Sequence, residues 1–431
     1  MKHKLLLFIA GLLAMQSLSA QETRALTLKD AIELSIKNSK VLRNNEARIA
    51  EANAIIKEAE EKRLPDAGIS AAYLYLPFKP NLDLKTGSGN GSPSVNQVVY
   101  GSANISLPIY NGGKIKYGIE SAKYLEQAVK LDADNDRSLV VLNIIGACIN
   151  LFKAHQAIAL VKENLQQSLQ RVKDLSNLEK NGLLARNDLL KAELQSSNTE
   201  LALLDAESNY KLACVNMNLM MGLPEQTVLI PDKNGLALPE VIKTIDEYEQ
   251  DALKNRNDLN AITFRKKSAD INLKSLKNDK YPSVSLTGGY IAADIPKFLS
   301  VYNAVNIGLG IKYNIASLWK NKSRIQQAES KVTQIQIGQE ILDDNIRMQV
   351  NQAYQAYLVS RKKIEVYEKS VIQATENYRI TKNKYDNSLA TTSELLDADV
   401  ALLQARLSVT NAKADSFLAW QKLLQVTGSL K

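Results

Sequence analysis

The sequence predicts an α+β protein made of long coiled α-helical hairpins and four short β-strands, with an internal twofold repeat. Three observations support this fold class: the second half of the chain repeats the first, the prolines avoid two long tracts, and apolar residues alternate in four segments. The repeat defines a duplication, the proline-free tracts predict helices, and the alternation predicts strands.

The second half of the 431-residue chain matches the first at an offset that changes once along the chain. A shift of 217 places Asn38 on Asn255, and further along a shift of 206 places Gly222 on Gly428. Solenoid repeats have periods of roughly 20–50 residues, so this period indicates a duplicated unit of domain size. The two units are expected at residues 21–230 and 231–431.

The first twenty residues have the pattern of an export signal. Lys2 and Lys4 precede an apolar run from Leu5 to Met15, and small and polar residues follow as far as Ala20. A membrane helix would need about 20 apolar residues, roughly twice this run. We therefore expect residues 1–20 to be a signal peptide.

After this signal, no segment is expected to be long and apolar enough to span a bilayer as a helix. The alternatives are a soluble periplasmic or secreted protein and a β-barrel in an outer membrane. The formal net charge of +8 falls to +6 without the two signal lysines. Because Lys and Glu are interleaved rather than clustered, this charge indicates solvated helix faces and no nucleic-acid partner.

The positions of the prolines predict the helices. All ten prolines lie in the zones Pro65–Pro108, Pro224–Pro239 and Pro282–Pro296, which leaves residues 109–223 and 297–431 without any. Proline inside a helix costs about 3 kcal/mol, and both free tracts are rich in Ala, Leu, Gln, Glu and Lys. Each tract is therefore predicted to be helical.

Each helical tract is interrupted once, at Glu179–Leu183 and at Lys384–Leu389. Asn-Gly and Asn-Ser in these interruptions are typical helix stops, so each tract is predicted to be a hairpin. The hairpins are expected at residues 113–222 and 317–427. The outgoing arm of the first hairpin, at about residues 113–180, would be roughly 100 Å long. A helix of this length must be coiled against neighbouring helices.

Four segments are predicted to be β-strands from their alternating apolar residues. Their length of about ten residues is enough to cross a membrane at a tilt, and tyrosines near their ends suit a membrane interface. A soluble β-hairpin on a helical protein is the alternative. The strands are expected at about residues 67–77, 96–109, 283–293 and 301–314.

This order of elements resembles the TolC family of outer-membrane channel proteins over essentially the whole mature chain. The most specific points are the two hairpin turns, Lys180-Asn181-Gly182-Leu183 with Asp188-Leu189-Leu190 and Tyr385 through Glu394-Leu395-Leu396-Asp397. The resemblance implies an outer-membrane exit duct for a tripartite efflux pump or a type I secretion system. It also implies two partners, a periplasmic adaptor and an inner-membrane transporter.

The resemblance further implies a homotrimer with a periplasmic α-barrel and a shared 12-stranded transmembrane β-barrel in outer-membrane lipid. The strand count independently requires an oligomer, because four strands cannot close a barrel and the smallest natural barrels have about eight. A dimer would have a filled interior, whereas a trimer would leave a lumen.

The resemblance implies that acidic side chains ring the closed end of the channel. The matching positions are Glu394 and Asp397, which lie three apart on one helix and share a face. Threefold symmetry would bring six carboxylates near the axis, where they would favour cations. The alternative is that both are ordinary solvated helix residues.

The family's bridge between hairpins maps to Tyr385 and Asp188. Its gating arginine falls at Ala390, so that contact is missing, and Arg186 or Lys384 could substitute. The resemblance also implies that an adaptor docks at the hairpin turns. The docking residues are expected to be Gly182, Leu183, Ser388 and Leu389.

No enzyme is predicted. After the signal the chain has one histidine, His155, and no nucleophile motif, phosphate-binding loop or Cys/His cluster, so no catalytic residue, metal or cofactor is expected. The competing function is a non-channel periplasmic coiled-coil adaptor or scaffold, although such adaptors carry one hairpin rather than two.

Two cysteines, Cys148 and Cys214, lie 34 residues before and 32 residues after Gly182. Residues equidistant from a hairpin turn lie side by side, so a disulfide is possible if both side chains face the seam. The alternative is that each is a small buried apolar residue.

Overall fold

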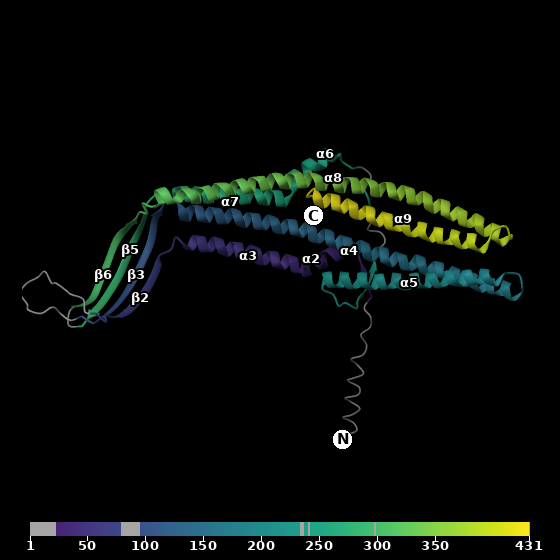
Figure 1. Ribbon diagram of the computed structural model, residues 1–431, viewed down its shortest axis with the longest axis horizontal. Coiled ribbons are helices and arrows are strands. Elements are labelled where there is room, and N and C mark those ends of the chain that lie inside the picture. Colours follow the sequence, from purple (N-terminus) through teal and green to yellow (C-terminus); the bar gives the residue numbers. More distant parts are fainter. Residues whose placement is uncertain (1–22, 79–94, 233–236, 240–241, 297–298, 431) are drawn as a thin grey trace, which may run out of the picture. The chain divides into compact units, whose positions relative to one another are not determined.

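The computed structural model describes residues 23–78, 95–232, 237–239, 242–296 and 299–430. The signal peptide expected at residues 1–20 lies outside them. The order of the described strands and helices is that of a duplicated unit (Figure 1). They are β1 (Thr23–Leu26), α2 (Leu28–Asn38), α3 (Lys40–Glu61), β2 (Asp66–Tyr75), β3 (Gln97–Asn111), α4 (Lys114–Lys180), α5 (Arg186–Met221), β4 (Val228–Pro231), α6 (Ile245–Asn255), α7 (Asn257–Lys277), η2 (Asn278–Lys280), β5 (Ser283–Ile295), β6 (Leu299–Lys312), α8 (Ser317–Asp386) and α9 (Thr392–Val426).

Strands β2, β3, β5 and β6 lie where the alternating pattern predicted them, with ends within two residues of the predicted ones. The two proline-free tracts form the pairs α4–α5 and α8–α9. Helices α4 and α8 contain 67 and 70 residues, which corresponds to about 100 Å each.

The chain packs as two compact units that differ from the two sequence repeats. Of the described residues, the hairpin unit comprises those within 23–45, 133–257 and 342–430, and the sheet unit comprises those within 46–132 and 258–341. Each unit takes segments from both repeats, because α4 and α8 each contribute residues to both units. The duplication therefore supplies half of each unit rather than one unit per repeat.

The sheet unit contains an antiparallel sheet in the order β2-β3-β5-β6. Strands β3 and β5 join the two repeats, and Ala103 is paired with Tyr290 at the middle of that ladder. The register shifts between Pro108 and Tyr110, where proline cannot donate to the ladder. Among the described strands, β2 and β6 are the edges of this sheet.

Apolar side chains on this sheet are largely exposed. Ile69 and Ile307 are 90% and 82% exposed, and Val305, Leu309 and Ile311 alternate along β6 with 69–74% exposure. Exposed tyrosines also lie at or near strand ends: Tyr73, Tyr75, Tyr110, Tyr281, Tyr302 and Tyr313. An apolar band with tyrosines near its limits is typical of membrane strands.

The core of the hairpin unit is built around α4. One buried cluster joins Ile144 and Leu151 of α4 to Met217 of α5 and to β1 and β4, which pair in parallel. A second cluster joins Ile145 and Ile149 of α4 to α9. Successive positions of one helix thus contact two different hairpin arms.

Within the described residues, one helix is apolar and long enough to cross a membrane by length and composition, and it is α4, whose most apolar 18-residue stretch has a mean hydropathy of 1.5. The expectation that no such segment follows the signal is therefore wrong. Ile144, Ile145, Ile149 and Leu151 of α4 are at most 2% exposed and belong to the two core clusters. The apolarity of α4 is thus explained in part by the packing of the hairpin unit.

The repeat reappears as a contact made twice in the hairpin unit. Gly222 and Gly428 end the second arm of each hairpin with φ of 71° and 69°. A Cβ on Gly222 would lie 3.0 Å from Asn38 Cγ, and a Cβ on Gly428 would lie 2.9 Å from the carbonyl of Asn255. Asn38 and Asn255 are equivalent positions in the repeat. Each hairpin therefore ends against the equivalent position of its own repeat.

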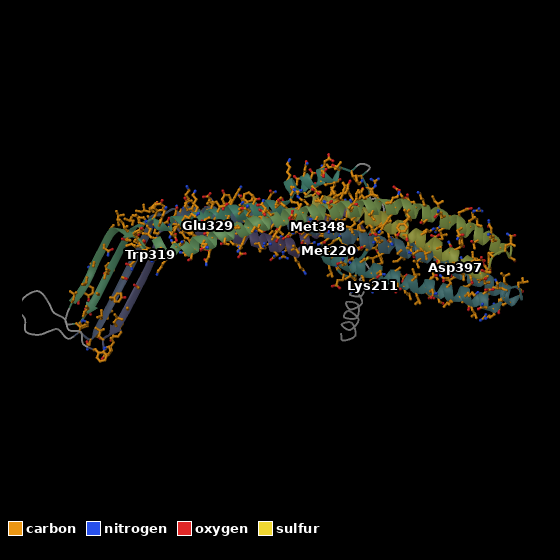
Figure 2. All side chains as sticks on the ribbon, turned by 45° about the horizontal axis from the view of Figure 1, so that its top comes forward. Lys211, Met220, Trp319, Glu329, Met348 and Asp397 are labelled. Carbon is orange, nitrogen blue, oxygen red and sulfur yellow. The ribbon has the colours of Figure 1, made fainter. Side chains whose placement is uncertain are left out.

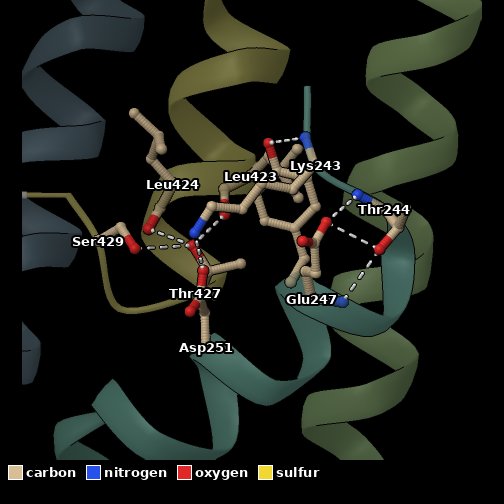
Figure 3. A network of polar contacts seen from close by, with 9 residues as sticks. Lys243, Thr244, Glu247, Asp251, Leu423, Leu424, Thr427 and Ser429 are labelled. Carbon is tan, nitrogen blue, oxygen red and sulfur yellow. Dashed lines mark hydrogen bonds and ion pairs between the residues drawn. The ribbon is translucent and has the colours of Figure 1, made fainter. Parts of the chain in front are cut away.

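The helices that begin the two repeats have related N-caps. Thr27 accepts a hydrogen bond from the Asp30 N–H, and Thr244 with Glu247 forms a complete capping box at the start of α6 (Figure 3). Near it, Lys243 donates to Asp251 at 2.6 Å. These caps satisfy helix N–H groups that would otherwise be unpaired.

Replacing Gly428 by Ala should destabilise the protein more than replacing Gly182 by Ala. Both residues have left-handed φ values, which cost a non-glycine residue about 1–2 kcal/mol. Only at Gly428 does the added Cβ also meet backbone atoms, whereas at Gly182 it meets nothing within 4 Å. Thermal unfolding followed by circular dichroism measures the difference. Equal decreases in Tm would contradict the packing of Gly428 on Asn255.

Candidate functional site

The two hairpin turns have the same backbone hydrogen bonds. In the first, Gly182 N–H donates to Glu179 O and Leu183 N–H to Leu178 O, both at 2.9 Å. In the second, Ser388 N–H donates to the Tyr385 carbonyl at 2.9 Å, and Leu389 N–H to the Lys384 carbonyl at 2.7 Å. Each donor and acceptor in one turn is equivalent to one in the other at the shift of 206. The repeat therefore extends to the atoms of the turns.

The turn residues expected to dock a partner are exposed. Leu183 is 74% exposed and Leu389 is 76% exposed, and the two leucines follow residues in left-handed conformations. Gly182 has φ of 71°, and Ser388 has φ of 62°, which serine rarely adopts. Each hairpin thus ends in one exposed leucine on a tightly turned backbone.

The two acidic residues predicted to form the ring, Glu394 and Asp397, are exposed near the N-terminus of α9. Figure 2 labels Asp397. Glu394 is also part of a capping box, in which the Thr391 N–H donates to its carboxylate at 2.7 Å and the Thr391 hydroxyl donates at 3.0 Å. The Thr391 N–H and then its hydroxyl lower the pKa of Glu394, and the charge of Lys384 lowers it further. Asp397 lies one turn further along α9.

The bridge expected between Tyr385 and Asp188 is not formed within the described chain. The Tyr385 hydroxyl instead lies 3.4 Å from the Thr392 hydroxyl, and its ring packs against a cluster of the first hairpin that includes Leu189. Asp188 is paired with Lys191 at 3.3 Å. The carboxylate therefore has a cationic partner three residues away on its own helix, while the tyrosine links the hairpins by apolar packing.

The cations proposed to replace the missing arginine are placed differently. Arg186 is 3.8 Å from Glu179 in an exposed pair within the first hairpin. Lys384 is exposed and close enough to Glu394 to affect its pKa. Lys191, which the sequence interpretation did not consider, donates to Ser393 at 3.2 Å and thereby joins α5 to α9.

The strongest polar link between the hairpins was also missed. Arg171 of α4 donates to Asp399 of α9 at 3.0 Å and to the Tyr378 hydroxyl of α8 at 3.3 Å. The Arg171 and Asp399 side chains are 11% and 3% exposed. Burial alone would lower the pKa of Arg171, but the hydrogen bond and charge of Asp399 outweigh it and raise that pKa. An arginine within the apolar pattern of α4 is the only sequence signal that could have revealed it.

Two other ion pairs join the hairpins in the described part of the chain, and their side chains are exposed or partly exposed. Arg406 of α9 lies 3.2 Å from Glu163 of α4, and Lys153 of α4 lies 2.7 Å from Asp415 of α9. Exposed pairs contribute little because solvent screens them.

Both cysteines are free thiols in the structure, so the disulfide considered from the sequence is corrected. Both pack in the same core cluster of the hairpin unit. Their surroundings differ, however. Cys148 lines a small cavity with Leu26 and Phe152, whereas Cys214 is buried beside Tyr210. The alternative interpretation, two small buried apolar residues, fits these positions.

Within the described part of the chain, no group of three or more His, Cys, Asp or Glu side chains could hold a metal ion. His155 packs against the Tyr210 ring with a centroid distance of 5.5 Å. The candidate site therefore consists of the two turns, the acidic start of α9 and the links between hairpins.

Comparisons with known proteins agree with the geometry. The family model described as "Outer membrane efflux protein" matches residues 31–223 and 249–429. Because these ranges cover most of the chain and lie one in each repeat, the chain belongs to the outer membrane efflux protein family.

Curated relatives are distant but matched over most of their length. The outer membrane efflux protein BepC of Brucella suis biovar 1 (strain 1330) is 22% identical, over 99% of this chain and 91% of that protein. Nodulation protein T of Rhizobium leguminosarum bv. trifolii is 23% identical, over 88% and 79% respectively.

Solved structures with the same fold include two outer-membrane channels. The channel OprN is 18% identical with a TM-score of 0.77, covering 93% of this chain and 90% of its own. The Campylobacter jejuni channel CmeC is 16% identical with a TM-score of 0.76, covering 93% and 85%. The chain is thus an outer-membrane efflux channel protein of the TolC type, and the adaptor alternative is not supported.

Cys148 should resist alkylation in the folded protein. Burial raises the pKa of its thiol to about 12, so very little reactive thiolate exists at pH 8. Iodoacetamide followed by mass spectrometry should label Cys148 only after denaturation. Cys214 in the same digest should also appear as a free thiol before reduction, and disulfide-linked peptides from the non-reduced protein would contradict both assignments.

Proposed function

We propose that this chain assembles as a homotrimer and serves as the exit duct of a tripartite efflux pump or a type I secretion system. The observation that carries the proposal is the four-stranded sheet, which has edges at β2 and β6 and exposed apolar side chains. Unpaired edges are costly in lipid, so such a sheet requires further copies of itself.

The strand directions allow closure. Each neighbouring pair in the order β2-β3-β5-β6 is antiparallel, so β2 and β6 run in opposite directions. When β6 of one copy pairs with β2 of the next, the new pair is also antiparallel. Three copies would form a closed barrel of about 12 strands, which leaves a lumen, whereas about eight strands are filled by side chains.

The partners follow from the hairpin turns. Two exposed leucines, Leu183 and Leu389, present apolar surface on turns that Gly182 and Ser388 shape. Exposed apolar side chains at such turns are available for contact with a protein partner. A periplasmic adaptor would dock here and connect the duct to an inner-membrane transporter.

The constriction would be formed by Glu394 and Asp397. A threefold axis near α9 would gather their carboxylates, which would repel one another and favour bound cations. Tyr385, Asp188 and Arg186 would set the position of the turns around this ring through the contacts described above.

Substituting Glu394 and Asp397 together by Ala should reduce the cation preference of the reconstituted trimer, or its block by divalent cations. The reason is the loss of six carboxylates near the axis. Reversal potentials in planar bilayers under a salt gradient measure the change. Unaltered selectivity in a double variant that still forms trimers would remove both residues from the constriction.

Substituting Gly182 by Val should impair export without loss of trimer. A β-branched residue is strained at φ of 71°, so the turn would rearrange. Gly182→Ser is the matched control, because Ser388 already occupies the equivalent position with φ of 62°. Export or drug resistance is measured in cells with equal trimer levels. Full activity of the Val variant would count against docking at this turn.

A further inference from the structure

The buried ion pair between Arg171 and Asp399 lies close to the proposed constriction. Arg171 is nine residues before Lys180, the last residue of α4, and Asp399 is two residues after Asp397 on α9. Arg171 also donates to Tyr378, so one guanidinium contacts both arms of the second hairpin. This is the point where the first hairpin holds α8 and α9 together.

Burial makes this pair different from the other links between the hairpins. Asp399 is 3% exposed, and a buried carboxylate without its cation is strongly disfavoured. Arg406 and Glu163 also join α9 to α4, but their side chains are 39% and 53% exposed. Water can replace either partner of the exposed pair, so of these two ion pairs the buried one holds the two hairpins to each other more firmly.

The pair also determines how α9 is rotated about its axis. Two residues along a helix correspond to a rotation of about 200°, so Asp397 points almost opposite to Asp399. The exposures agree, because Asp399 is buried and Asp397 is exposed. As long as Arg171 holds Asp399 inside the hairpin contact, Asp397 is directed away from it.

We propose that Arg171 is a positioning residue for the channel constriction: by holding Asp399 and Tyr378 it fixes the seat and rotation of α9 and so directs the carboxylates of Glu394 and Asp397. This role rests on the proposed channel function and on the constriction assigned to α9. Ala390 occupies the position of the family's gating arginine. In this proposal Arg171 takes over that role from the other hairpin, at a buried position outside the ring of carboxylates.

The test compares three variants and one control in reconstituted full-length trimers: Arg171→Gln, Asp399→Asn, the charge exchange of Arg171→Asp with Asp399→Arg, and the control Arg406→Gln with Glu163→Gln. Arg171→Gln and Asp399→Asn should raise the equilibrium constant for channel opening by roughly fivefold or more, which is the lower end of the usual coupling between two sites. Both variants should also weaken cation preference. The charge exchange should restore part of both properties. The control should behave as the unmodified protein, because its pair is exposed.

Single-channel recording in planar bilayers gives open probability and reversal potential from the same experiment. A merely structural ion pair would lower trimer yield or Tm without changing these readouts in the trimers that form. If a buried variant fails to fold, Tyr378→Phe removes one hydrogen bond only and should change open probability in the same direction. Unchanged gating and selectivity in Arg171→Gln or, where that variant does not fold, in Tyr378→Phe would overturn the inference. Absence of conductance in the unmodified trimer would instead refute the channel proposal.

Discussion

Long helices without a globular core are the constraint on which this structure depends. Helices α4 and α8 contain 67 and 70 residues, so they can be covered only by other helices lying along them. In the hairpin unit, α4 provides this cover by packing on α5 through one cluster and on α9 through another. One chain still leaves apolar side chains uncovered on α5, where Leu194, Leu201, Leu212 and Leu219 are 60–65% exposed. Spacings of seven and eleven residues place these leucines along one face, as expected of a surface that further copies cover.

The duplication meets this constraint by making each contact twice. The turns of the two hairpins have the same backbone hydrogen bonds. The second arm of each hairpin ends in a glycine that packs on an equivalent asparagine. Because α4 and α8 run through both units, the two repeats lie side by side in each unit rather than forming one unit each. The β3–β5 ladder is the clearest consequence, since it pairs a strand from the first repeat with one from the second.

Local signals in the sequence were enough to predict the four strands of the sheet and the two long hairpins, but not the short strands β1 and β4. The two proline-free tracts mark the long hairpins, period-two alternation marks β2, β3, β5 and β6, and Asn-Gly or Asn-Ser marks the hairpin turns. The contacts between hairpins were harder to predict, because they depend on which face of each helix is turned inward. The Tyr385–Asp188 bridge stays a prediction, because in the single chain Asp188 pairs with Lys191. The two cysteines are free although both pack in one core cluster. Arg171 and Asp399 are 228 residues apart, and nothing local identifies them as partners.

The two hairpin turns share a backbone but differ in the chemistry that they present. Helix α5, which follows the first turn, has Ala185 as its N-cap, with no side-chain cap hydrogen bond, and Asp188 in its first turn. Helix α9, which follows the second turn, begins with the Thr391–Glu394 capping box. Glu394 therefore lies at a helix N-terminus, where backbone N–H groups stabilise negative charge. In a ring of carboxylates mutual repulsion would raise the pKa of each group, but the hydrogen bonds from Thr391 act in the opposite direction on Glu394. The cap that starts α9 would thus also keep a negative charge at the proposed constriction.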